Sequence, residues 1–196
     1  MLSLCRTAAW IVCVIYSTIP AFWLLIHPGV EFWRSRRRSP YRILLPVWIG
    51  MWALVAALTA RWRGVLLYGS DYTWIPAAGF FCAGLLLYRF AHAEFSFTQL
   101  GGLPEVLPGH SQQRLVTTGV RARVRHPVYL GHLCEMLAWS LATGLAVGWA
   151  LTAFATATGA VMIRLEDKEL ENRFGDPYRQ YRSRVPAVLP RIRIKT

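Results

Sequence analysis

The chain has 196 residues, of which 55% are hydrophobic and 16% are charged, and its formal net charge is +12. Soluble domains average about 45–50% apolar and about 25% charged residues, so this composition argues against an ordinary soluble domain. Almost all of the positive charge is arginine, and the arginines flank long apolar blocks. That arrangement favours a membrane surface over nucleic acid as the partner of the positive charge, and we expect no nucleic-acid binding.

Long apolar blocks recur along the chain, each close to the roughly 20 residues that a helix needs to cross a bilayer. These blocks cover residues 8–26, 43–60, 74–90 and 128–163. The last block is too long for one span at about 1.5 Å per residue. Gly144 and Gly148 offer a tight reversal there, which divides the block into helices over 129–145 and 148–163. The pattern predicts an all-α, polytopic membrane helical bundle with five transmembrane helices.

Arginine-rich and arginine-poor connectors alternate along these spans. The first connector, the third connector and the C-terminal tail are rich in arginine, whereas the second connector holds only Arg61 and Arg63 and the fourth holds none. Because cytoplasmic loops carry the excess of lysine and arginine, we expect the N-terminus outside and the C-terminus in the cytoplasm.

We expect a single membrane domain over residues 1–196. Its parts are three N-terminal spans (1–90), a cytoplasmic loop (91–127), a helical hairpin (128–163) and a cytoplasmic tail that completes the site (164–196). The loop contains several glycines and prolines, which break regular structure. The tail pattern predicts a helix from Arg164 to about Arg182, with an interruption at Gly175-Asp176-Pro177.

The four cysteines are scattered without Cys-x-x-Cys spacing. Cys13, Cys82 and Cys134 lie inside apolar blocks, and Cys5 lies before the first block. We expect small buried side chains, no disulfide and no metal site.

The first polar motif is Arg125-His126-Pro127-Val128-Tyr129, at the entrance of the fourth span, preceded by Leu115-Val116-Thr117-Thr118-Gly119. Proline suits the first turn of a helix, and a helix N-terminus favours an anionic group. The histidine and the tyrosine add hydrogen bonds and aromatic faces. This edge is suited to a ligand with a carboxylate and a flat heterocycle, but a simple interfacial anchor explains the same residues equally well.

The second polar motif is Arg164-Leu165-Glu166-Asp167, followed by Phe174-Gly175-Asp176-Pro177-Tyr178. It lies at the end of the fifth span, so the predicted hairpin returns its carboxylates to the same membrane face as His126. The alternative is an amphipathic helix on lipid headgroups, with acid–base pairs at helical spacing.

Together the two motifs resemble the isoprenylcysteine carboxyl methyltransferase superfamily, which also includes the phospholipid methyltransferases. The ordered motifs run from Leu115 to Pro190. The resemblance implies a membrane methyltransferase that uses S-adenosyl-L-methionine, bound on the cytoplasmic side. It also implies a lipidic or prenylated acceptor, such as a prenylcysteine carboxylate, that enters from the bilayer.

Carried over by position, the resemblance implies ten cofactor-binding residues. They are Gln113, Arg114, Leu115, Val116, Arg121, His126, Pro127, Val128, Tyr129 and Glu166. Two positions depart from the family pattern. Arg121 stands where members often have a tyrosine, and Met162 stands where a family arginine contacts the substrate.

Three residues are candidates for a catalytic role. Arg164 lies near the position of the missing arginine, but two residues along a helix turn it to another face. His132 and Glu135 lie three residues apart in the fourth span. Ionisable groups inside spans are costly and often functional, so this pair could deprotonate a substrate or line its entrance. The alternative is a polar pair whose members satisfy each other.

Three other functions stay open from the sequence. A phospholipid N-methyltransferase would act on an amine, whereas a membrane protein with a degenerate cofactor site would not be an enzyme. Membrane sterol reductases resemble the C-terminal half and use NADPH, but the length of 196 residues counts against them.

Overall fold

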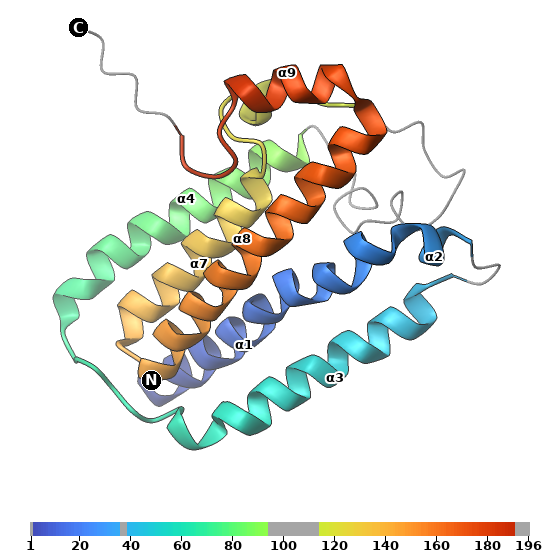
Figure 1. Cartoon of the computed structure of the whole chain (residues 1–196). Coiled ribbons are helices and arrows are strands. Elements are labelled where there is room, and N and C mark those ends of the chain that lie inside the picture. Colours follow the sequence, from blue (N-terminus) through green and yellow to red (C-terminus); the bar gives the residue numbers. More distant parts are fainter. Residues whose placement is uncertain (1, 36–38, 94–113, 191–196) are drawn as a thin grey trace, which may run out of the picture.

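The computed structural model describes residues 2–35, 39–93 and 114–190, and the regular elements in these ranges are helical (Figure 1). The α-helices are α1 (Leu2–Ile26), α2 (Val30–Arg34), α3 (Tyr41–Thr59), α4 (Trp74–His92), α7 (Pro127–Thr143), α8 (Ala146–Phe174) and α9 (Asp176–Arg184). Four short 3-10 turns join them: η1 (His27–Gly29), η2 (Ala60–Trp62), η3 (Asp71–Thr73) and η4 (Gly119–Ala122). The all-α prediction is confirmed for the described ranges.

Four stretches are long and apolar enough to cross a membrane: Ser3–Trp33, Tyr41–Trp62, Asp71–His92 and Ala146–Phe174. Large apolar side chains cover the outside of α3, where Leu54 and Leu58 are exposed. An apolar surface of this kind is suited to lipid contact rather than to water. The chain is therefore an integral membrane protein.

The remaining predicted span corresponds to α7, which has 17 residues. At 1.5 Å per residue it is about 26 Å long, at the short end of what crosses a bilayer. Four of the five predicted spans are thus supported by length and composition. That α7 is the fifth, and that the N-terminus lies outside, stay predictions.

The reversal between α7 and α8 lies at Gly144, as the sequence predicted, but Gly148, predicted as part of the turn, lies inside α8. Its φ is +66°, and a Cβ there would lie 2.2 Å from the Tyr68 carbonyl oxygen, so only glycine fits. Two hydrogen bonds hold the turn to the connector after α3. The Leu67 N–H donates to the Gly144 oxygen at 2.8 Å, and the Ala146 N–H donates to the Val65 oxygen at 3.0 Å.

Helix α7 packs against α4, α8 and α1, whereas α3 lies at the edge of the bundle beside α1 (Figure 1). Glycine allows α4 and α7 to approach closely. A Cβ at Gly131 would lie 2.6 Å from the Tyr88 ring, and one at Gly84 would lie 2.6 Å from Oε1 of Glu135.

Helix α8 continues without a break through the expected junction between residues 163 and 164. Its 29 residues make it about 44 Å long, longer than the hydrocarbon core of a bilayer, which is about 30 Å thick. The helix ends where Gly175 adopts a φ of +62°, and α9 begins at the next residue. The predicted interruption at Gly175-Asp176-Pro177 is confirmed.

The cysteines differ from the expectation of uniform burial. Cys13 and Cys134 are buried and Cys5 is half-buried, but Cys82 lies on the exposed face of α4. That face is apolar, which explains why the hydrophobic pattern alone indicated burial.

Candidate active site at the α7–α8 end of the bundle

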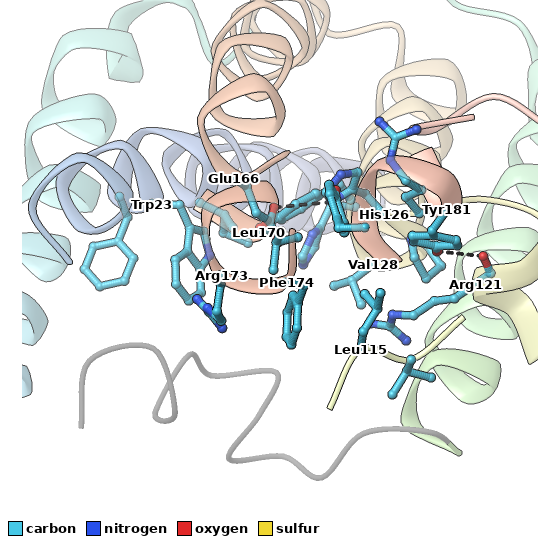
Figure 2. Close-up of a pocket in the computed structure, with 18 of the residues that line it drawn as sticks. Trp23, Leu115, Arg121, His126, Val128, Glu166, Leu170, Arg173, Phe174 and Tyr181 are labelled. Carbon is cyan, nitrogen blue, oxygen red and sulfur yellow. Dashed lines mark hydrogen bonds and ion pairs between the residues drawn. The ribbon is translucent and has the colours of Figure 1, made fainter. Parts of the chain in front are cut away.

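A cavity of about 420 Å³ lies where α7 begins and α8 approaches α9 (Figure 2). Nine of the ten residues implied by the family resemblance line it: Arg114, Leu115, Val116, Arg121, His126, Pro127, Val128, Tyr129 and Glu166. Gln113 lies outside the described residues. The hairpin returns α8 to the starting end of α7, which brings the two sequence motifs to one place.

Asp167 lies beside this cavity and joins several charged and polar side chains. The sequence did not predict this role. It is buried, and its Oδ2 lies 2.6 Å from Nη2 of Arg125. Its Oδ1 lies 3.1 Å from Nε2 of His126 and accepts a hydrogen bond from the Tyr178 hydroxyl. A buried carboxylate is tolerated only when paired and hydrogen-bonded in this way.

His126 lies between two carboxylates. Its Nδ1 is 3.3 Å from Oε2 of Glu166, and its Nε2 points at Asp167. The ring stacks on Tyr129, with centroids 5.6 Å apart and planes inclined by 22°. Burial alone would lower the pKa of His126, but the negative charge of Glu166 and the hydrogen bond to Asp167 outweigh burial and raise the pKa from 6.5 to about 9. The histidine is therefore an imidazolium at neutral pH, balancing the two acids together with Arg125.

Glu166 is a carboxylate that lines the cavity. Figure 2 shows Glu166 and His126 turned toward each other. Their contact is an ion pair, and a hydrogen bond from Tyr129 also stabilises the charged form of Glu166. A carboxylate can accept about four hydrogen bonds. A ligand that donates a hydroxyl or an ammonium hydrogen can therefore still bind to Glu166.

The C-terminal segment ties the wall of the cavity together. The Arg125 N–H donates to the Pro186 oxygen and the His126 N–H to the Ala187 oxygen, both at 2.9 Å. The Tyr181 hydroxyl donates to the Arg121 oxygen at 2.7 Å. Pro186 and Ala187 thus contribute to the cavity wall through their backbone carbonyls.

The opposite wall comes from the N-terminal half and was not predicted. It is apolar and aromatic, and its residues are Ile19, Phe22, Trp23, Tyr41, Leu45 and Trp48. Phe22 stacks on Trp48 with centroids 5.0 Å apart. The available signal was the spacing of Ile19, Phe22 and Trp23, which places these three side chains on one face of a helix.

The three catalytic candidates separate in the structure. His132 lines the cavity, Glu135 packs against Gly84 of α4, and Arg164 is exposed on α8 outside the cavity lining. Among the described residues no hydrogen bond or ion pair joins His132 to Glu135, and each has a buried atom without a hydrogen-bond partner. Met162 is fully buried.

Fold and site together define an α-helical membrane protein with a charged and aromatic cavity at one end of its bundle. The chain belongs to the phospholipid methyltransferase family, whose family model matches residues 78–177, just over half of the chain. The matched region contains both polar motifs up to Pro177. The resemblance inferred from the sequence is confirmed.

Several relatives with curated functions are similar to parts of the chain. The protein-S-isoprenylcysteine O-methyltransferase of Schizosaccharomyces pombe is 32% identical over 59% of this chain and 49% of its own length. Methanethiol S-methyltransferase 2 of Bradyrhizobium diazoefficiens is 31% identical over 82% of this chain and 54% of its own length. The Delta(14)-sterol reductase of Mus musculus is 28% identical over 65% of this chain and 34% of its own length.

The chain spans about half the length of the first two of these relatives. No solved structure matches the chain.

Proposed function

We propose that this chain is a methyltransferase that moves a methyl group from S-adenosyl-L-methionine to an apolar acceptor. Membership of a methyltransferase family supports the reaction class. The observation that carries the proposal is the Glu166 carboxylate, which lines the cavity beside the His126–Tyr129 stack.

The residues of the cavity fit the chemical groups of this cofactor. Glu166 offers an acceptor for a hydroxyl or the ammonium group, and arginines such as Arg121 offer partners for the carboxylate. The rings of Tyr129 and Phe174 offer faces for the adenine. When bound, the cofactor supplies an electrophilic methyl group on a positively charged sulfur.

Methyl transfer is an in-line displacement, so the protein must align the two reactants and exclude water. The His126–Asp167–Arg125 cluster supports alignment because each member is fixed by charged hydrogen bonds. The aromatic wall of α1 and α3 supports both water exclusion and the binding of an apolar acceptor.

We propose a lipidic or prenylated acceptor. The name of the Schizosaccharomyces pombe relative supports a prenylcysteine carboxylate as one candidate. An amine-bearing phospholipid is the second candidate, favoured by the description of the matching family. Met162 and Arg164 bear on this choice. The first is buried and the second lies outside the cavity lining, so neither supplies the arginine expected for a carboxylate.

Isothermal titration calorimetry on the purified full chain tests the proposal. We expect S-adenosylmethionine and S-adenosylhomocysteine to bind, and Glu166→Gln to weaken binding about tenfold, which corresponds to roughly 1.4 kcal/mol. The matched control is Lys168→Gln, because Lys168 is exposed on the same helix outside this cavity.

Absence of binding by a folded protein would refute the methyltransferase and leave the degenerate site. Binding of NADPH in place of the methyl donor would indicate the reductase chemistry of the sterol-reductase relative.

A further inference from the structure

The cavity also contains an imidazole to which the proposed cofactor contacts give no role. His132 lies three residues beyond Tyr129 on α7, and its ring lines the cavity. Its Nδ1 is buried without a hydrogen-bond partner. A buried nitrogen without a partner is unusual in a folded protein and calls for a reason.

Three tyrosine rings surround this histidine. Two come from other helices, and the third comes from α7 itself. The centroid of the His132 ring lies 5.0 Å from that of Tyr16 on α1, 5.5 Å from that of Tyr88 on α4 and 6.4 Å from that of Tyr129 on α7. The contacts with Tyr16 and Tyr88 are edge-to-face, so the two tyrosines hold the imidazole ring in place.

No carboxylate forms an ion pair with His132 within the described part of the chain. Glu135 lies on the next turn but packs against Gly84. The other charged groups that line the cavity are the His126–Glu166 pair and four arginines, Arg114, Arg121, Arg125 and Arg173. His132 thus differs from His126, which two carboxylates hold in the charged form.

We propose that His132 accepts the proton that the methyl acceptor loses, so the acceptor is a nucleophile with an exchangeable proton, a thiol or a neutral amine. This inference rests on the proposed function. The proton moves from the acceptor sulfur or nitrogen to the free imidazole nitrogen. The lone pair of the acceptor forms the new bond to the methyl carbon. The old carbon–sulfur bond breaks, and its electron pair remains on the sulfur, which becomes a neutral thioether.

A carboxylate acceptor would not need this residue. It is already ionised at neutral pH and has no proton to lose. It would instead need a fixed cation, yet Met162 occupies the position at which the family resemblance implies an arginine. His132 and Met162 therefore both favour an acceptor with an exchangeable proton over a carboxylate.

The test compares methylation of octanethiol, octylamine and octanoate by the full chain in detergent, with isotope-labelled S-adenosylmethionine. We expect the thiol or the amine to be methylated, and His132→Gln to lower kcat about 100-fold, the usual size of general-base catalysis. We also expect the variant to lose the rise of kcat with pH. Cys134→Ala, a change on the same helix outside the cavity lining, should retain the wild-type rate.

Binding provides a second readout. S-adenosylhomocysteine should bind His132→Gln as tightly as wild type, whereas octylamine should bind the product-saturated variant several-fold more weakly. Preferred methylation of octanoate, or a His132→Gln variant with wild-type kcat and pH profile, would overturn the inference. A wild-type protein that does not bind S-adenosylhomocysteine would instead contradict the proposed function itself.

Discussion

At the residue scale, the site depends on which of two adjacent acids faces which partner. Glu166 and Asp167 are neighbours, and both were visible in the sequence as a cofactor-side motif. Adjacent residues on a helix point about 100° apart, and here one faces the cavity while the other is buried against Arg125 and Tyr178. The sequence predicted the first role and missed the second, because the partner that buries Asp167 comes from α9 and from the segment before α7.

The raised pKa of His126 predicts a specific dependence of stability on pH. Folding raises this pKa from 6.5 to about 9, so the folded state binds the proton more tightly. The stabilisation is fully present below pH 6.5 and is lost as the pH rises through about 9. We expect the difference in Tm between wild type and His126→Asn to be largest near pH 6 and to shrink toward pH 10. A difference that stays constant over this range would contradict the charged state assigned to His126.

At the element scale, the hairpin of α7 and α8 was predictable and the wall from α1 and α3 was not. Gly144 interrupts an overlong apolar block, and this signal is local. The spacing of Ile19, Phe22 and Trp23 places them on one helix face but does not say what that face contacts, because lipid-facing and cavity-facing aromatic side chains look alike in an apolar helix. Only the packing of α1 against α7 and α8 reveals which of them face the site.

The hairpin turn requires glycine at position 144. Gly144→Ala would force a positive φ on alanine and drive its Cβ against the Tyr68 carbonyl, which costs about 1–3 kcal/mol or more. We expect a lower Tm and weaker S-adenosylhomocysteine binding, because the turn sets the register of α8 against α7. Gly64→Ala is the control, since a Cβ there meets nothing within 4 Å. Equal Tm values for the two variants would show that the turn is not constrained as described.

At the scale of the whole molecule, the two ends of α7 support its role as a fifth span. It begins beside the cavity, which also contacts Tyr41 at the start of α3. It ends at Gly144, hydrogen-bonded to the connector that follows α3. Helix α7 therefore covers the same distance through the bundle as α3, which is itself long and apolar enough to cross.

The arginine distribution predicts the orientation of the molecule in the membrane. The cavity end carries the arginine-rich segments, which we propose to be cytoplasmic. In a background without native cysteines, Gly69→Cys should react with a membrane-impermeant maleimide in intact cells, whereas Ser39→Cys should react only after the membrane is opened. The reverse pattern would invert the proposed topology, and labelling of both sites in intact cells would argue against α3 as a span.

We propose that the cavity between α7, α8 and α9 binds the methyl donor through Glu166. A structure of the full chain with S-adenosylhomocysteine tests this binding mode. We expect a hydroxyl or the ammonium group of the ligand to lie within about 3.2 Å of the Glu166 carboxylate, with the ligand in the cavity lined by Tyr129 and Phe174. A ligand bound elsewhere, with none of its atoms near Glu166, would contradict this proposal.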